Sequence, residues 1–391
     1  MLSLQALLLM LIAASLAFAR TQAPSLSVRL KTTLTSYRSR EGSSFLGVVT
    51  APYCDRGKVV IPAGSTVYGA VRRVQSVGLG IVRERATLDL DFNSYELPDG
   101  RRFAFAGVLA RVDNSREEVT AKGEVKGILA ANGPQSLVGG IWHWPNFETM
   151  PRSFFGMTGL GGRIATAYSV GPAGVAGLFI ARCALLRMPE PEIRMPAGTD
   201  VRVRVTSLPP LAPTFEPPEE RPLPDALSEW WGAQAFDVQR ANGAGAADVI
   251  NVAFVGGRAD LMRAFRVAGW QQAEPLTKWS FARAYNAYSA QRGYSTAPVS
   301  KLTYRGDEPH VVFQKSYNTI SKRHHIRVWE SEDGDREVWL AAATHDVGVE
   351  FKRGIRVPHR ISPYVDAERS KVVNDLAFGG CVDHVSYLDR P

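Results

Sequence analysis

The sequence has none of the short motifs that mark the common catalytic centres. HExxH, CxxC, GxSxG, GxGxxG and the P-loop are all missing from its 391 residues. Each of these spacings places side chains or backbone amides around a metal, a nucleophile or a phosphate. The sequence therefore contains no motif that would indicate a zincin, a hydrolase, a dehydrogenase or a kinase.

Cysteine is scarce as well. The three cysteines, Cys54, Cys183 and Cys381, fall one to a region, which is not the pattern of a disulfide framework. We interpret each of them as a small buried hydrophobic residue and not as a nucleophile.

Acidic residues are outnumbered, and the formal net charge is +8. From residue 301 to residue 391, however, 14 Lys and Arg residues balance 14 Asp and Glu residues. The excess of positive charge therefore lies before residue 301, where Lys and Arg residues are scattered among β-like segments. This distribution argues against nucleic acid as a partner and leaves an anionic membrane surface or polymer open.

The chain begins with a long apolar run, "MLSLQALLLMLIAASLAFA", that ends in Ala17-Phe18-Ala19. A small-x-small end is typical of signal-peptide cleavage, so we predict a signal peptide over 1–19 and a mature chain that begins near Arg20. No Lys or Arg precedes the run, so a mis-chosen start or an uncleaved anchor are the alternatives. The expected location is the periplasm or cell envelope after export.

Residues 20–209 are predicted to form a β-rich domain, because short alternating runs are separated by Gly, Pro, Asn and Asp. "RATLDLDFNSYEL" places Ala86, Leu88, Leu90 and Phe92 on one face, and an Asp-Gly turn follows it. "IPAGSTVYGAV" at Ile61 is echoed by "MPAGTDVRVRV" at Met195. The echo predicts that the second segment returns the chain to the same barrel or sandwich.

A glycine-rich insertion, at about 133–186, is predicted to interrupt this domain. Residues 164–181 carry no charge, and 18 residues is the lower limit for a membrane-spanning helix. The run is rich in Ala and Gly, so two interpretations stay open. It is either an insertion that lies on the barrel or a segment that contacts a membrane.

A proline-rich linker over 210–235 separates this domain from a C-terminal mixed α/β domain over 236–391. "DVINVAFVG" predicts a strand buried on both faces, and "GRADLMRAFRVAGW" predicts a helix. A second helix is capped by Thr277, and a last one begins with Ser362 as N-cap and ends at Gly379. The predicted fold class is therefore α+β multidomain.

Six of the seven histidines follow residue 301, and two of them are adjacent in "KRHHIRVWE". Because side chains alternate along a strand, His325 shares one face with Arg327 and Trp329, and His324 lies on the other. The first face is predicted to be a polar groove or surface that holds a site. His324 is predicted to face the core.

The last helix combines an apolar stripe with Arg369, and Asp366 lies one turn away on its border. A charge directed at a core needs a partner, so these two residues are either an i, i+3 ion pair or part of a site. Glu368 points almost to the opposite side. Asp346 ends a buried strand, where it serves either a cap or a site.

The order of segments from Asp248 onward resembles the LssY C-terminal domain family. The segments are "VINVAFVGGRADLMRAFRVAGWQQAEPLT", "YSTAPVSKLTYRGDEPHVVFQKS", "KRHHIRVWE", "VWLAAATHDVGVEF" and "VPHRISPYVDAERSKVVNDL". The resemblance implies a domain often appended to membrane proteins, including lipid phosphatases of the phosphatidic-acid-phosphatase type. No phosphatase module is present here, so a lipid-phosphate function is implied by association alone.

The resemblance also implies a set of polar site residues. His345 departs from the family pattern, where a basic residue is usual, and it is not included in the set. The matching residues are Gln314, Lys315, His324, His325, Arg327, Trp329, Thr344, Asp346, His359, Arg360, Asp366, Glu368 and Arg369. The β-rich part is weakly similar to the β-barrel of TrbI-like type IV secretion proteins, which implies a barrel with an inserted helical segment.

We draw three hypotheses for the function. In the first, the C-terminal domain binds an anionic small molecule or lipid head group, with binding residues Gln314, Lys315, Arg327, Trp329, Arg360 and Arg369. In the second, it is a hydrolase with catalytic residues His325, Asp346, His359 and Asp366. In the third, it is a structural envelope component. No cofactor is predicted, although a divalent metal at His325, Asp346 and His359 stays open. No oligomeric state is predicted.

Overall fold

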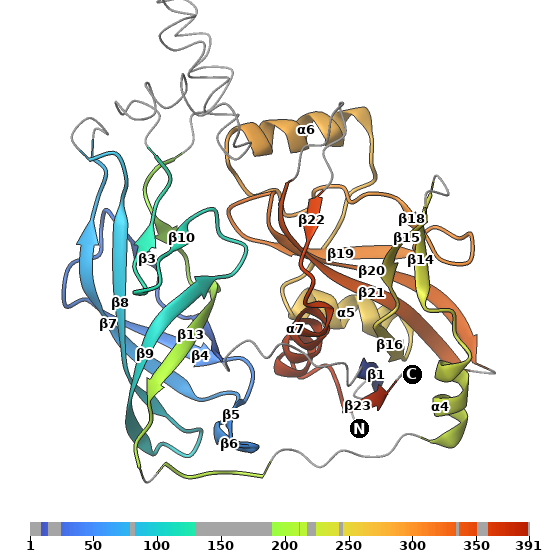
Figure 1. The fold of residues 1–391 in the computed structure, drawn as a ribbon, viewed down its shortest axis with the longest axis horizontal. Coiled ribbons are helices and arrows are strands. Elements are labelled where there is room, and N and C mark those ends of the chain that lie inside the picture. Colours follow the sequence, from blue (N-terminus) through green and yellow to red (C-terminus); the bar gives the residue numbers. More distant parts are fainter. Residues whose placement is uncertain are drawn as a thin grey trace, which may run out of the picture.

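The chain folds into a β-barrel and a mixed α/β domain that lie side by side (Figure 1). The structure is a computed structural model. It describes residues 9–14, 25–78, 83–129, 190–210, 212–216, 224–241, 245–333, 336–349 and 359–389. The predicted insertion at about 133–186, with its uncharged run at 164–181, lies outside the described residues.

The first domain is a closed antiparallel barrel. Its strands follow the order β8-β7-β4-β2-β13-β9, and β8 pairs with β9 to close the ring. The echo segment at Met195 leads into β13, which pairs with both β2 and β9, so the predicted return to the barrel is confirmed. The barrel strands are β2 (Ser25–Leu30), β4 (Ser44–Val49), β7 (Thr66–Gln75), β8 (Thr87–Glu96), β9 (Arg102–Val112) and β13 (Asp200–Ser207).

The described part of the first domain also contains six short strands besides those of the barrel. They are β3 (Leu34–Thr35), β5 (Tyr53–Asp55), β6 (Lys58–Ile61), β10 (Glu118–Val119), β11 (Val125–Lys126) and β12 (Arg194–Met195). Cys54 lies on β5 in the small β5–β6 hairpin and is exposed, and Cys381 is half-buried. The expectation that these cysteines are buried is therefore wrong, because the β5–β6 hairpin is not a strand of the barrel. Cys183 lies outside the described residues.

Every second side chain of the strand around Leu88 points into the barrel interior, as predicted. Ala86, Leu88, Leu90 and Phe92 are all buried. The rings of Phe45 and Phe92 meet edge to face at 5.3 Å between centroids, an arrangement that aromatic pairs favour. The interior is thus a packed core.

Gly69 on β7 makes this packing testable. A methyl group at Gly69 would overlap the Phe45 ring and the backbone carbonyl of Asp91, and the carbonyl cannot move without breaking the sheet. We expect Gly69→Ala to lower the free energy of unfolding by about 1–3 kcal/mol in chemical denaturation, as overpacking does. At Gly232, the last residue of a helix, nothing described lies within 4 Å of an added methyl. Gly232→Ala is expected to be neutral or to stabilise by up to about 1 kcal/mol. Equal effects of the two changes would contradict the packing argument.

The C-terminal domain is built on a twisted sheet in the order β17-β19-β20-β21-β16-β1-β23, with β22 paired to β21. Strands β20 and β21 form a hairpin, in which His324 pairs with His345 and His325 pairs with Thr344. The strands are β1 (Leu9–Ala14), β16 (Val252–Val255), β17 (Gln271–Gln272), β19 (Val311–Ser316), β20 (Arg323–Asp333), β21 (Arg336–Val349), β22 (His359–Ile361) and β23 (His384–Asp389). A smaller sheet contains β14 (Asp237–Arg240), β15 (Ala246–Val249) and β18 (Leu302–Thr303).

Both faces of the main sheet are covered. Helices α5 (Arg258–Val267) and α7 (Val365–Phe378) pack on one face, and α4 (Asp225–Gly232) packs with the smaller sheet on the other. This confirms the two-sided burial predicted for the apolar strand at Val252. The remaining described helix, α6 (Lys278–Ser289), follows β17 along the chain.

The helix ends agree with two of the three predicted caps. Thr277 caps α6 by accepting a hydrogen bond from the Ser280 amide, and Gly379 ends α7. The predicted N-cap of α7 is wrong, because the helix begins at Val365 with Tyr364 at the N-cap. The Ser362 hydroxyl instead accepts a hydrogen bond from the Tyr364 amide, so it forms a turn before the helix.

The apolar N-terminal run contributes β1 to the C-terminal sheet. Leu9 pairs with Val255 of β16 on one side and with His384 of β23 on the other. Cleavage after Ala19, as the sequence predicts, would remove this strand from the mature chain. Among the described residues, no helix is both long and apolar enough to cross a membrane.

Candidate metal centre at the domain interface

Helix α7 lies between the sheet of the C-terminal domain and the barrel (Figure 1). Its apolar side, with Val372 and Leu376, packs into the sheet core. Its other side carries Glu368, Lys371 and Asp375, and all three are buried as well. The sequence predicted that Glu368 points away from the apolar stripe, but a second domain covers that side. Three ionisable side chains are thus enclosed between the domains.

Paired charges join α7 to the barrel. Asp375 accepts hydrogen bonds from Lys371 at 3.0 Å and from Lys315 of β19 at 2.8 Å. Asp200 of the barrel accepts from Lys371 at 2.8 Å and from Arg29 at 2.7 Å. Arg29 also reaches Asp375 at 3.3 Å. Both lysines are therefore shared between aspartates of the two domains.

The pKa values follow from burial and from these pairs. Burial by itself would raise the pKa of Asp200, but Lys371 and Lys315 hold it well below its usual value. Burial would lower the pKa of Lys371, but Asp200, Asp375 and Asp113 raise it above the usual range. For Lys315, burial and the adjacent Lys371 prevail and lower the pKa.

Next to this network, two histidines and a glutamate form a cluster. His324 on β20 and His345 on β21 are direct cross-strand neighbours, and their rings stack at 4.1 Å between centroids. Glu368 comes from α7, and its Oε2 lies 2.6 Å from His324 Nδ1. One nitrogen from each histidine and one carboxylate oxygen all lie within 4.8 Å of one another. Two imidazoles and a carboxylate are a common ligand set for zinc.

Several polar atoms of the cluster are buried without a hydrogen bond. Among the described residues, His324 Nε2, Glu368 Oε1 and the neighbouring Asp113 Oδ2 have no hydrogen-bond partner. His324 and Glu368 are only 2% and 3% exposed. A buried polar atom that lacks a partner costs roughly 1–3 kcal/mol, so it marks a place where a bound group would be stabilising.

Burial also sets the protonation of the cluster. It lowers the pKa of His324 well below its usual value, and the nearby His345 and Lys371 lower it further. Burial lowers the pKa of His345 to about 4. It raises the pKa of Glu368 well above its usual value, although Lys371 opposes the shift. Both imidazoles are therefore neutral at neutral pH, which is the form that binds metal ions.

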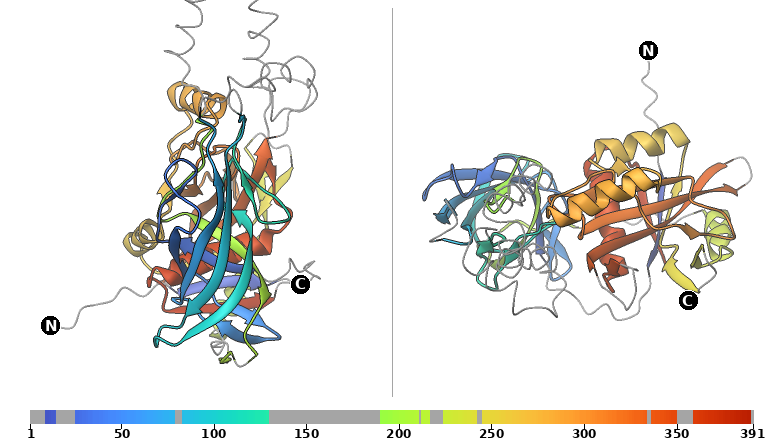
Figure 2. Two further views of the ribbon diagram at one scale, coloured as in Figure 1. Left: turned by 90° about the vertical axis from the view of Figure 1, so that its left-hand side faces the viewer. Right: turned by 90° about the horizontal axis from the view of Figure 1, so that it is seen from above.

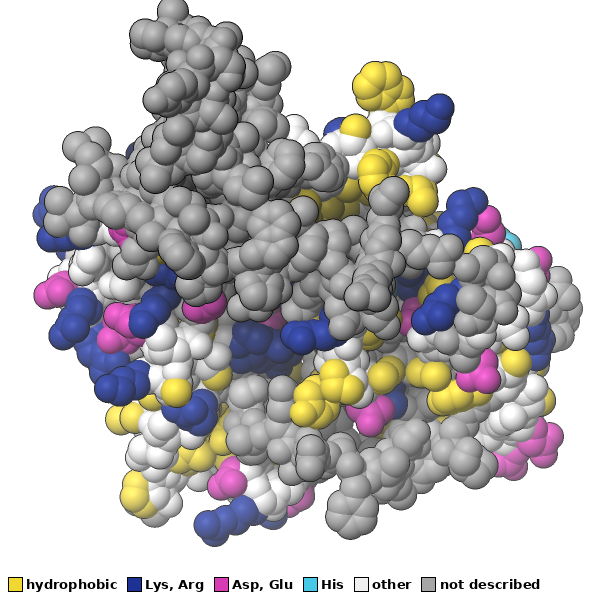
Figure 3. Space-filling model, turned by 45° about the horizontal axis from the view of Figure 1, so that its top comes forward, with side chains coloured by type: hydrophobic (Ala, Val, Ile, Leu, Met, Phe, Trp, Pro, Cys, Tyr) yellow, Lys and Arg dark blue, Asp and Glu magenta, His cyan; other side chains and the backbone are white. Residues whose placement is uncertain are grey.

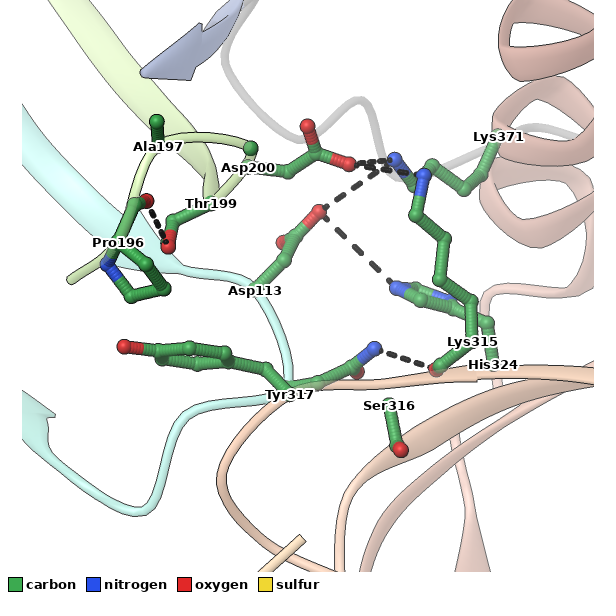
Figure 4. Close-up of a pocket in the computed structure, with 12 residues that line it drawn as sticks. Asp113, Pro196, Ala197, Thr199, Asp200, Lys315, Ser316, Tyr317, His324 and Lys371 are labelled. Carbon is green, nitrogen blue, oxygen red and sulfur yellow. Dashed lines mark hydrogen bonds and ion pairs between the residues drawn. The ribbon is translucent and has the colours of Figure 1, made fainter. Parts of the chain in front are cut away.

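A cavity of about 230 Å³ opens beside the cluster, between the barrel and the C-terminal domain (Figure 4). His324 Nε2 faces Asp113 Oδ2 across 4.0 Å, and Lys371 Nζ lies 3.9 Å from the same oxygen. Asn114, the neighbour of Asp113, places its Oδ1 3.2 Å from His345 Nε2. The cavity is lined by Asp113, Asn114, Pro196, Ala197, Gly198, Thr199, Asp200, Lys315, Ser316, Tyr317, His324 and Lys371.

The cluster suits a divalent cation in its donor set and its spacing. Zinc bonds of about 2.1 Å in a tetrahedral site hold the ligand atoms roughly 3.4 Å apart. The three ligand atoms already lie within 4.8 Å, so small side-chain rotations close the site. Three protein ligands leave the fourth position open, and His324 borders the cavity on that side.

The predicted site around His325 is a separate, buried network on the opposite face of the sheet. His325 Nε2 lies 3.2 Å from Asp346 Oδ1, and Arg323 donates to the other oxygen of Asp346 at 3.1 Å. Arg327 donates to Asp248 at 2.8 Å and to Ser300 at 3.0 Å. The expectation of a polar groove or surface is wrong, because Ser300 and Asp248 cover this face and its charges are paired internally.

The other predicted residues are dispersed. Gln314 is buried and donates to Ala297, and the Trp329 indole donates to the Asp307 carbonyl. The ion pair of Arg369 with Asp366 is confirmed at 2.9 Å, and it lies on α7 without contact to His325. Arg360 is exposed on β22, and the side chain of His359 is outside the described part of the chain. Lys315 and His324 are the two that reach the cavity.

Sequence reasoning missed His345, the role of Glu368, and the barrel residues Asp113 and Asp200. One signal for His345 was present in the sequence. A two-residue turn between Asp333 and Arg336 in "SEDGDR" pairs His324 with His345, because residue numbers across an antiparallel pair keep a constant sum. No comparable signal brings Asp113 to His324, since the two residues belong to different domains.

Comparisons with known proteins agree with the C-terminal resemblance. Residues 233–390 match the family model described as LssY C-terminus. None of the curated proteins compared with the chain matches it. Among solved structures, ComB10 of the Com type IV secretion system of Helicobacter pylori is 16% identical with a TM-score of 0.24, over 50% of this chain and 94% of that one. The C-terminal part of this protein, residues 233–390, is thus similar to the LssY C-terminus family.

Proposed function

We propose that the protein binds a divalent metal ion at His324, His345 and Glu368, and that the metal holds a small anionic ligand in the interdomain cavity. The observation that carries this proposal is that two of the three clustered residues each bury a polar atom, His324 Nε2 and Glu368 Oε1, without a hydrogen-bond partner among the described residues. They belong to a His-His-Glu set beside a cavity large enough for a phosphate or carboxylate group. A cation would satisfy the set and offer its open position to an oxygen anion.

The lysines alone do not supply such a site. Lys315 donates to Ala268 and Asp375 and forms an ion pair with Asp200 at 3.2 Å. Lys371 is held between Asp200 and Asp375. An anion in this cavity therefore needs a further positive charge, and a metal beside His324 supplies it. Arg111, which is paired with Asp113, adds a favourable long-range charge.

The apolar run at the start of the chain supports a location in the cell envelope, since a run that ends in Ala-Phe-Ala is typical of exported proteins. Zinc ligation by histidine and carboxylate does not depend on a reducing compartment, unlike ligation by free thiols. An envelope location and a His-His-Glu site are thus compatible.

The same geometry favours a second candidate, a metal-dependent hydrolase. Three protein ligands with one open position are the arrangement of catalytic zinc sites. Asp113 lies on the cavity side, and its Oδ2 atom has no hydrogen-bond partner in the described chain. Its pKa is lowered, because the cations of Arg111, Arg202 and Lys371 outweigh its burial. As a carboxylate it would take a proton from a water molecule in the cavity.

Metal and anion binding are tested together by calorimetry on the full chain. After dialysis against chelator, we expect the wild type to bind one zinc ion and to bind inorganic phosphate only when zinc is present. Glu368→Gln keeps the side-chain shape and removes the carboxylate, and it is expected to weaken zinc binding by about tenfold or more. Phosphate affinity that is equal with and without zinc would contradict the proposal.

The hydrolase is tested with zinc-loaded protein against phosphomonoester, phosphodiester and carboxyl-ester substrates. Turnover that needs zinc and falls by about 100-fold in Asp113→Asn would support it. No turnover in any of the three classes, with zinc bound, would rule the hydrolase out and leave metal-assisted binding.

A further inference from the structure

Helix α6 presents large apolar side chains to solvent. Trp279 is 81% exposed, Phe281 is 64% exposed, and Leu276 just before the helix is 52% exposed. Figure 3 shows hydrophobic and basic side chains standing out together over α6. Exposed Trp and Phe in one place are costly in water and mark a contact surface.

The end of the molecule that carries α6 is also where the chain leaves and re-enters the barrel. The Arg116 guanidinium donates to the Gln291 carbonyl, just past α6, at 3.0 Å, and it donates to the Glu190 carbonyl as well. Gly127 lies against the Pro191 carbonyl. The described residues that flank 130–189 in the sequence therefore lie close to the C-terminal end of α6. Figure 2 shows α6 at one end of the molecule.

The composition of both segments indicates what the contact surface meets. The sequence of 130–189 contains the uncharged run 164–181, and its charged residues are Glu148, Arg152, Arg163, Arg182 and Arg187. Helix α6 itself carries Lys278 and Arg283 and has no acidic residue, and Arg283 is paired with Glu274, which precedes the helix. Apolar and aromatic groups mixed with Lys and Arg, and almost without acids, match the interface of an anionic bilayer.

We infer that α6 docks on an anionic lipid surface, with Trp279 and Phe281 inserted among the lipid head groups and Lys278 paired with phosphate. Trp and Phe have large apolar surfaces, and the Trp N–H keeps a hydrogen-bond partner at the interface. The metal centre lies between the domains and not on this helix, so the inference is independent of the proposed function. Anionic lipid is thus the partner of this surface.

Vesicle co-sedimentation of the full chain tests the inference. We expect binding to vesicles of phosphatidylethanolamine with phosphatidylglycerol, and weaker binding to phosphatidylcholine vesicles. The double change Trp279→Ser with Phe281→Ser is expected to weaken binding to the anionic vesicles by about tenfold or more. Lys278→Glu is expected to weaken binding to anionic vesicles only. Val267→Ser, at an exposed apolar residue of α5, is the matched control and should bind like the wild type.

Other occupants of the surface give different results. If residues 130–189 cover α6, the double change lowers the melting temperature and leaves vesicle binding unchanged. If a second copy covers it, the wild type is dimeric without lipid and the double change makes it monomeric. Either result, or an absence of vesicle binding by the wild type, overturns the inference.

Discussion

Replacement of Asp375 by alanine is expected to lower the free energy of unfolding by about 3–5 kcal/mol, the usual effect of removing one partner from a buried ion pair. Asp375 is 1% exposed on α7 and accepts hydrogen bonds from Lys315 and Lys371. It also accepts from the Trp270 indole at 3.1 Å. Without this carboxylate, two buried ammonium groups and an indole N–H lose their shared acceptor.

The matched control is Asp99→Ala in the barrel. Asp99 pairs with Arg101 at 2.8 Å, but both side chains are half exposed. Water screens such a pair, so the expected loss is much smaller than for Asp375→Ala. Urea denaturation of both variants measures the difference. Equal losses would mean that the charges between the two domains contribute no more than surface pairs do.

His324→Ala is expected to abolish stoichiometric zinc binding, whereas His325→Asn, one residue along the same strand, is expected to retain it. The two side chains leave β20 on opposite faces, and only His324 lies beside His345 and Glu368. Loss of one of three protein ligands lowers metal affinity by about 100-fold or more. Zinc content after dialysis, measured by atomic emission, separates the variants.

The neighbouring histidine makes this comparison informative. Both positions are buried, so a general loss of folding would affect the two variants alike. Asparagine at position 325 retains a hydrogen-bonding group for Asp346 and Thr344, which keeps that network largely paired. Retention of zinc by His324→Ala would contradict the proposed site. Loss of zinc from His325→Asn alone would indicate that the metal binds on the other face of the sheet.

The barrel and the core of the C-terminal sheet could be predicted from the sequence because they depend on local alternation. Phe92 and its neighbours repeat every second residue, and the "PAG" echo marks the strand that rejoins the barrel. Strand pairing of "HHIRVWE" with "EVWLAAAT" followed from the acidic turn between them. These signals lie within short segments, in which the conformational propensities of the residues and the period of the apolar positions determine the local structure.

The site could not be predicted in the same way, because burial of its residues depends on contacts between domains. His325 shares a face with Arg327 and looked like a surface residue, but Asp248 and Ser300 cover that face. Glu368 meets His324 on β20, and Asp113 of the first domain lies beside this pair. A pattern within one helix or strand does not report what another domain places against it.

The most direct test of the metal centre is anomalous diffraction at the zinc absorption edge from crystals of the full chain grown with zinc. The geometry predicts an anomalous peak within bonding distance of His324, His345 and Glu368, at the edge of the cavity bordered by Asp113. No peak at that position in zinc-loaded crystals, or a peak at His325 and Asp346 alone, would contradict the account.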